Sequence, residues 1–147
     1  MATQDMDNAA ENTLNRLIPS KEQYGNVRVL YDQVTMAAAL AQNDVLNIGA
    51  PIPAGSRFLY GIILSTVTVG ATATIAIGFT PLDGSAADPN AYRLAATHTV
   101  ANVPSFFGHT AGIQTVLAVE SQIDLTIGAA NFPAGGELSI MLFFARE

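Results

Sequence analysis

The chain of 147 residues contains no cysteine and no tryptophan, and it has few charged residues. Without cysteine it can form neither a disulfide framework nor a thiolate metal site. Charged residues make up 12% of the chain, against roughly 25% in typical soluble domains. After Ala37 the only basic residues are Arg57, Arg93 and Arg146. Because a domain surrounded by water normally carries more charge, we expect other protein to cover part of its surface.

The formal net charge of −6 argues against binding to nucleic acid or to anionic membranes, both of which need clustered Lys and Arg. The first 15 residues have no basic segment followed by an apolar one, so we expect no signal peptide. The uncharged stretch from Phe58 to Phe79 is long enough to span a bilayer. Its Gly, Ser and Thr content and its alternation of polar and apolar residues instead favour β-strands.

Short apolar segments follow one another after residue 26 and predict an all-β domain, an antiparallel β-sandwich that is jelly-roll-like. We expect strands at residues 27–34, 45–48, 57–69, 71–80, 113–119, 122–127 and 137–145. The third and fourth of these are expected to form a hairpin around Gly70 and Ala71. Residues 36–42 are Ala-rich and fit either a helical turn or an extended link. Residues 81–112 resemble a long loop, with a helical turn at 90–96.

Alternation also predicts which faces of the strands are buried. Ile123, Leu125 and Ile127 share one face of their strand, with polar residues between them. The last strand has apolar residues on one face and also Met141 and Phe143 on the other. A strand that is apolar on both faces is covered on both faces. The second cover could come from another chain.

Two segments of the sequence resemble each other. Leu46-Asn47-Ile48-Gly49-Ala50 leads into Ile52-Pro53-Ala54-Gly55, and Leu125-Thr126-Ile127-Gly128-Ala129 leads into Phe132-Pro133-Ala134-Gly135. In both segments the positions of Pro and Gly suit a tight turn between two strands. The similarity is either a coincidence of turn chemistry or the sign of two related halves, as in a jelly roll.

The first 26 residues differ from the rest, since they are polar and have little to bury. We therefore divide the chain into an N-terminal arm, residues 1–26, and a β-sandwich domain, residues 27–147. Leu14, Leu17 and Ile18 fall at helical spacing before Pro19, and a helix that short needs a surface to dock on. The arm is either a frayed terminus or a segment that reaches a neighbouring subunit through these three anchors.

Residues that could carry chemistry are few. His98 and His109 are the only histidines, and no serine lies in a nucleophile elbow. We therefore expect no catalytic residues, no cofactor and no metal site. The two histidines are expected at the surface or at an interface. The Asp83–Asn90 loop has oxygen ligands that could hold calcium, although ordinary turn chemistry explains them better. Phe106 and Phe107 are adjacent in the expected loop and cannot easily share one core face. They either tuck under that loop or act as interface anchors.

The segments from Val27 to Asp32 and from Asn43 to Leu59 resemble small virion structural proteins of tailed bacteriophages, most closely capsid decoration (cement) proteins. The resemblance covers residues 25 to 80 best, and its motif, an apolar strand followed by D-V-L-N-I-G, P-A-G and a second apolar strand, is of low specificity. It implies a β-sandwich or jelly-roll trimer on the outer surface of the capsid, with an arm that clamps neighbouring subunits and no catalytic residues.

From these observations we predict a protein that binds the outside of a phage head and bridges neighbouring capsid subunits. The expected partners are the major capsid protein and further copies of the chain, as a trimer. The residues predicted to lie at capsid or subunit interfaces are Leu14, Leu17, Ile18, Phe106, Phe107, Met141 and Phe143. The alternatives are another virion component, such as a tail or head-fibre base, and a carbohydrate-binding jelly roll, which the absence of tryptophan disfavours.

Overall fold

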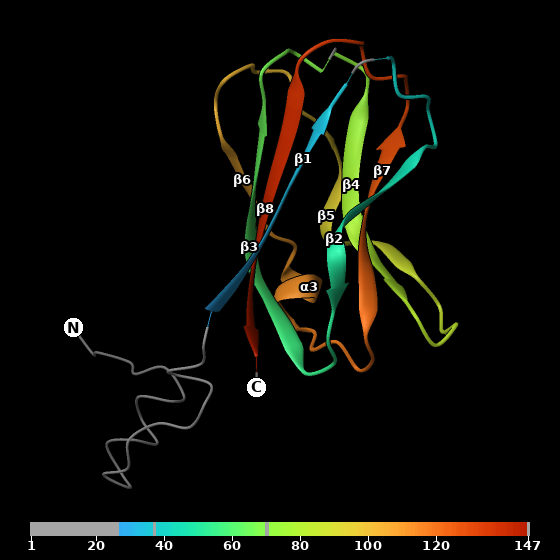
Figure 1. The fold of residues 1–147 in the computed structure, drawn as a ribbon, viewed down its shortest axis with the longest axis vertical. Helices are drawn as coiled ribbons and strands as arrows, with labels where there is room; N and C mark the ends of the chain where they lie inside the picture. Colours follow the sequence, from blue (N-terminus) through green and yellow to red (C-terminus); the bar gives the residue numbers. More distant parts are fainter. Residues whose placement is uncertain (1–26, 37, 70, 147) are drawn as a thin grey trace, which may run out of the picture.

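The computed structural model describes residues 27–36, 38–69 and 71–146, whose strands form two antiparallel four-stranded sheets packed face to face (Figure 1). The first sheet has the order β1 (Val27–Thr35), β8 (Glu137–Arg146), β3 (Ser56–Ser65) and β6 (Ser105–Phe107). The second has the order β2 (Val45–Ile52), β7 (Ser121–Gly128), β4 (Thr74–Pro81) and β5 (Asp88–Thr97). Two sheets with this strand order form a jelly roll. The predicted fold class is therefore confirmed.

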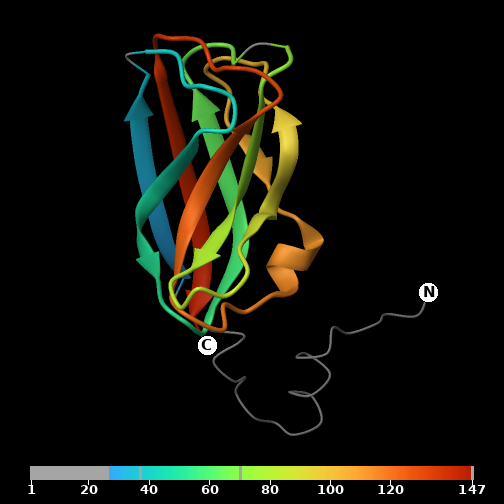
Figure 2. The same ribbon diagram turned by 90° about the vertical axis from the view of Figure 1, so that its right-hand side faces the viewer.

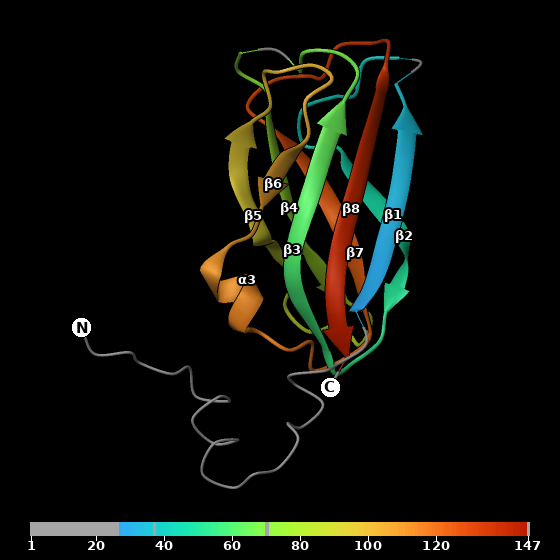
Figure 3. The same ribbon diagram turned by 90° about the vertical axis from the view of Figure 1, so that its left-hand side faces the viewer.

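A short helix, α3 (Thr110–Gln114), packs against β3 and β5 at one side of the sandwich (Figure 3). None of the helices in the described ranges combines the length and the apolar character that crossing a membrane requires.

The core lies between the two sheets, where the alternating residues of each strand meet. The predicted inward face of β7, formed by Ile123, Leu125 and Ile127, is fully buried. Aromatic rings join the two layers: Phe58 of β3 lies 4.4 Å from Tyr92 of β5, centroid to centroid, and 5.7 Å from Phe144 of β8. These rings explain how β5, which is exposed along most of its length, is still held in place, because each aromatic side chain buries a large apolar area.

The two similar segments of the sequence occupy equivalent places in the fold. β2 and β7 pair with each other, Leu46 opposite Leu125, and the strands that follow them, β3 and β8, pair in the other sheet. Gly55 and Gly135 end the two corners with φ of +78° and +92°, a conformation that favours glycine. The two segments therefore form strand–corner–strand units at equivalent places in the jelly roll.

The predicted hairpin of residues 57–80 is wrong. β3 and β4 lie in different sheets, where β3 pairs with β8 and β6 while β4 pairs with β7 and β5. Alternation fixes which side chains point inward, but it carries no information about the partner strand, since partners can be distant in sequence.

The long loop predicted at 81–112 is also wrong in part, because it contains β5 and β6. Seven of the ten residues of β5 are exposed, and only Ala91, Tyr92 and Arg93 are buried. This leaves no alternating pattern to detect. The helical turn expected at 90–96 is extended instead.

Residues 113–119 form no strand either: α3 occupies their first part, and Val116 makes an isolated bridge with Arg57. Short apolar runs of this kind fit a helix and a strand equally well. The described residues of 36–42 adopt the extended alternative. Met36 is buried, and Leu40 bridges to Phe132.

Candidate interaction surface

The described residues contain no group of three or more His, Cys, Asp or Glu side chains that could hold a metal ion. In the Asp83–Asn90 loop, hydrogen bonds from the side chain of Ser85 and from its backbone amide, the latter at 2.9 Å, lower the pKa of the Asp83 carboxyl. The carboxylate of Asp88 accepts one from the Asn90 amide at 3.1 Å. These are ordinary turn hydrogen bonds.

The two histidines differ in how deeply they are buried. His98 is 3% exposed, so the expectation of a surface position is wrong for this residue. Burial and the nearby Arg93 lower its pKa. His109 directly precedes α3 and is half-buried. Neither residue forms part of a recognisable acid–base arrangement in the described part of the chain.

The most prominent feature is an apolar surface on the outside of the β1-β8-β3-β6 sheet, the sheet seen from outside in Figure 3. Two charged residues of the same face border it, Arg57 opposite Ala145 and Glu137 opposite Thr35. Alternation along each strand turns every second side chain outward. We call this surface the apolar face; its members are Val27, Val29 and Tyr31 of β1, Met141, Phe143 and Ala145 of β8, Tyr60, Ile62 and Leu64 of β3, and Phe106 of β6. None of the ten carries a charge.

Strand register makes the apolar face continuous. Phe143 of β8 lies between Val29 of β1 and Tyr60 of β3, and its ring stacks on that of Tyr60 with centroids 4.3 Å apart. In the next row, Met141 lies between Tyr31 and Ile62. Apolar pairs therefore extend across three strands without a polar interruption.

The fourth strand extends the apolar face to the edge of the sheet. Phe106 of β6 lies opposite Ile62, and its ring centroid is 6.4 Å from that of Tyr60. Phe106 is 73% exposed, and Val27, Val29 and Tyr31 at the other edge are each more than half exposed. Monomeric proteins rarely leave a contiguous apolar patch of this kind in water.

The residues predicted to lie at an interface are distributed unevenly over the structure. Met141, Phe143 and Phe106 come together on the apolar face, whereas Phe107 points the other way and packs on Phe58 with ring centroids 6.2 Å apart. The apolar face therefore includes Phe106 and leaves out Phe107. Leu14, Leu17 and Ile18 lie outside the described residues.

The sequence reading missed the contributions of β1 and β3 to this surface. Val27, Val29 and Tyr31 occupy alternate positions of their strand, and nothing in the sequence shows whether the face that they share is inner or outer. Tyr60 and Ile62 lie in a segment in which nearly every residue is apolar. β3, like the last strand, is apolar on both faces, and this pattern could have identified Tyr60 and Ile62 as outward residues of a covered strand.

Comparison with known proteins gives a likeness of fold. No model of a known protein family and no curated protein matches the sequence. A chain from the capsid of Ralstonia phage GP4 superposes with a TM-score of 0.68 at 17% identity, over 84% of this chain and 86% of that one. A chain from the capsid asymmetric unit of cyanophage Pam1 gives a TM-score of 0.61 at 19% identity over the same shares.

A third structure, the acid-stable capsid of Helicobacter pylori bacteriophage KHP30, gives a TM-score of 0.53 at 11% identity, over 81% of this chain and 86% of its matching chain. At identities this low, what the three structures share with the chain is its fold: the jelly roll described above also occurs in chains of bacteriophage capsids.

Proposed function

We propose that the chain is a capsid decoration (cement) protein, which binds the outside of a phage head and stabilises the shell by bridging neighbouring capsid subunits. The observation that carries this proposal is the apolar face, ten uncharged side chains spread over four strands of one sheet. A fold shared with chains of phage capsids supports it. Burial of apolar area is the main favourable term in protein association.

The proposed mechanism requires no chemistry. A protein that binds the assembled shell and not its dissociated subunits stabilises the shell by mass action. Repeated at many symmetric sites, contacts of modest strength add up over the whole particle. The partners we propose are the major capsid protein and further copies of the chain, as a trimer, with residues 1–26 acting as an arm separate from the β-sandwich domain.

The apolar face can be tested with one charge placed at its centre. Phe143→Asp should weaken binding to emptied phage heads by at least about 30-fold, because truncation of an interface anchor often costs about 2 kcal/mol or more. The matched control is Thr126→Asp, which places the same charge on the outside of the opposite sheet. Binding is measured by co-sedimentation with the heads, and circular dichroism verifies that both variants fold.

A second variant guards against misfolding, because Phe143 also stacks on Tyr60. Phe106 is so exposed that Phe106→Ser leaves the core intact, and it should still reduce occupancy of the heads. Undiminished binding by both variants would contradict the role of the apolar face.

The arm and the oligomer need separate tests. Deletion of residues 1–20 should lower occupancy of the heads if the arm bridges subunits, and native mass spectrometry should show trimers at micromolar concentration. A stable monomer that does not bind phage heads would contradict the proposal. Imaging of the particle distinguishes the head from a tail or fibre-base position.

A further inference from the structure

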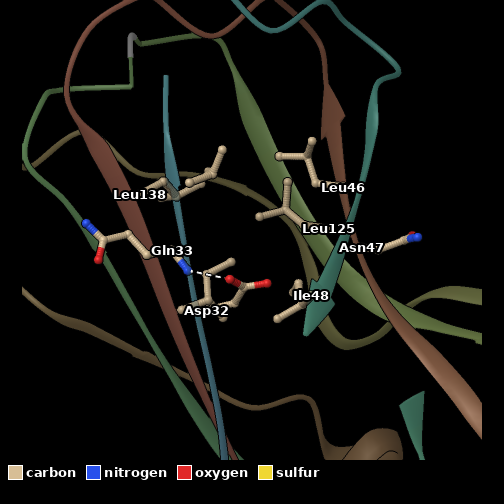
Figure 4. A pocket seen from close by; sticks show the side chains of 9 residues that line it. Asp32, Gln33, Leu46, Asn47, Ile48, Leu125 and Leu138 are labelled. Atoms are coloured by element: carbon tan, nitrogen blue, oxygen red, sulfur yellow. Dashed lines mark hydrogen bonds between the residues drawn. The ribbon is translucent and has the colours of Figure 1, made fainter. Parts of the chain in front are cut away.

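We propose that, in the free protein, a cavity between β1 and β2 holds the apolar side chains of the chain's own N-terminal arm, with Leu17 and Ile18 as the residues that enter it. The cavity has a volume of about 230 Å³ and lies where the two sheets part (Figure 4). β1 and β2 are the terminal strands of their sheets, so neither has a neighbouring strand on this side within residues 27–146 as the structure describes them. The sandwich is therefore open here to an added segment.

The lining of the cavity suits aliphatic side chains. Most of its wall is apolar: Val34, Leu46, Ile48, Leu125, Leu138 and Ile140. Figure 4 shows Leu46, Leu125 and Ile48 directed into the space between the sheets, while Gln33 and Asn47 point away from it. Water binds poorly in a cavity with such walls, because it needs several polar partners. An apolar side chain is a more favourable occupant.

Asp32 gives the cavity a fixed lower edge. Its carboxylate accepts a hydrogen bond from the backbone amide of Gly49 at 2.7 Å and so ties β1 to β2. This bond spans the gap between the two sheets at one end of the cavity and leaves the part next to Val34 and Leu46 accessible. The opening is therefore built into the fold and does not depend on one loose side chain.

The length of the arm identifies the occupant. Ile18 precedes Val27 by nine residues, which span up to about 30 Å when extended. The distance along β1 from Val27 to Val34 is about 23 Å at 3.3 Å per residue. The arm reaches the cavity if the chain reverses its direction just before β1, and the two residues there are Gly25 and Asn26, which favour tight reversals.

Tethering favours the chain's own arm over that of another molecule. A short flexible link gives its ends an effective concentration in the millimolar range, well above the concentration of other copies in dilute solution. Docking in this way shelters Leu17 and Ile18 until the protein meets a shell. Their release to bridge capsid subunits is the only part of this inference that rests on the proposed function.

The absence of cysteine makes a site-specific test straightforward. A nitroxide label on Ser20→Cys, next to the anchors, should broaden the NMR signals of the methyl groups of Val34, Leu46 and Ile48. The methyl groups of Leu94, which is 54% exposed on the edge strand β5 of the second sheet, serve as the reference and should broaden less. Equal broadening at both places would overturn the proposal.

Two variants show whether the contact is specific. Leu17→Ser combined with Ile18→Ser removes the anchors from the labelled arm, and Leu46→Phe fills the cavity from within. Each should reduce the broadening at Val34 to that at Leu94, while the dispersion of the other signals shows that the domain stays folded. Persistent broadening in both variants would mean that the arm does not use the cavity.

A mixed sample identifies the source of the arm. Spin-labelled chains without isotopes are combined with isotope-labelled chains that carry no spin label. If the arm docks on its own molecule, the isotope-labelled chains show no broadening in this mixture. Broadening as strong as in a chain that carries both the spin label and the isotopes would show that arms exchange between copies, and it would overturn the proposal. All these measurements use the purified protein, so their failure is distinct from a failure to bind phage heads.

Discussion

The two sheets have different outer surfaces. The apolar face covers the outside of the β1-β8-β3-β6 sheet, whereas the two central strands of the β2-β7-β4-β5 sheet, seen in Figure 2, turn small and polar residues outward. On β4 and β7 these are Thr74, Ala76, Gly78, Thr80, Gln122, Asp124 and Thr126. Arg93 and Asp124 of the second sheet and His98, which directly follows β5, are buried.

Several polar groups of the second sheet find partners within the chain: the hydroxyl of Thr80 donates to the carboxylate of Asp124, and the guanidinium of Arg93 donates to the carbonyls of Ile75, Ala96 and Thr97. The register of β4 and β5 shifts next to Ile75. Arg93 therefore satisfies carbonyls that the irregular pairing would otherwise leave bare. The first sheet instead leaves apolar side chains exposed, among them Tyr60 and Phe106.

The largest effect on stability should come from glycines that allow close approach. A Cβ on Gly78 of β4 would overlap the backbone of Asp88 and Pro89, whereas one on Gly61 of β3 would meet only the ring of Phe107. Gly78→Ala should lower the free energy of unfolding by about 3 kcal/mol, and Gly61→Ala by about 1 kcal/mol, because a ring can move and a strand cannot. Urea denaturation measures both, and equal losses would contradict this ranking.

Asp124 tests how much a hydrogen bond between two outward side chains stabilises the second sheet. Asp124→Ala removes the acceptor of the Thr80 hydroxyl, which water can then solvate because Thr80 is exposed, and should cost about 1 kcal/mol of unfolding free energy. Asp124→Asn retains an acceptor oxygen at the same place and should cost less. A loss that is the same for both variants would show that the carboxylate charge, and not the hydrogen bond, is what matters.

His98 should make stability depend on pH. Burial lowers its pKa, and Arg93 lowers it further. Just below pH 6.5, the ordinary value for histidine, the unfolded chain therefore binds a proton that the folded chain does not. The free energy of unfolding should fall as the pH drops through this range, while above it the residue has no effect. His98→Gln should flatten that slope in urea titrations at several pH values. Identical slopes in both proteins would exclude this residue as the cause.

The smallest effect on stability is expected on the apolar face itself. Phe106→Ser should change the free energy of unfolding by less than about 0.5 kcal/mol, since the side chain is largely in water already. Phe107→Ser, one residue along the same strand, removes a ring that packs on Phe58 and should cost about 2 kcal/mol. If both substitutions destabilised equally, Phe106 would be part of the core and the apolar face would be smaller than described.

Strands could be predicted where polar and apolar residues alternate clearly, but the sequence does not show which strands pair with each other. β7 and β8 could be predicted together with their inward faces, because Ile123 and Leu138 begin regular apolar series. β5 could not, since Tyr92 and its neighbours are buried in the middle of an otherwise exposed strand. The apolar face could be predicted only at Met141, Phe143 and Phe106. Its other members can be identified only from the strand register, which shows which strands are neighbours.

The pairing of Val27 with Ala145 brings the two described ends of the chain to the same pole of the molecule. The turns that connect β1 to β2 and β7 to β8 lie at the opposite pole (Figure 1). A peptide or enzyme joined directly before Val27 or directly after Arg146 would therefore emerge on the same side, and a short linker between these two positions would allow new ends to be opened elsewhere. If the domain does coat a particle, this geometry would set how a fused cargo is presented.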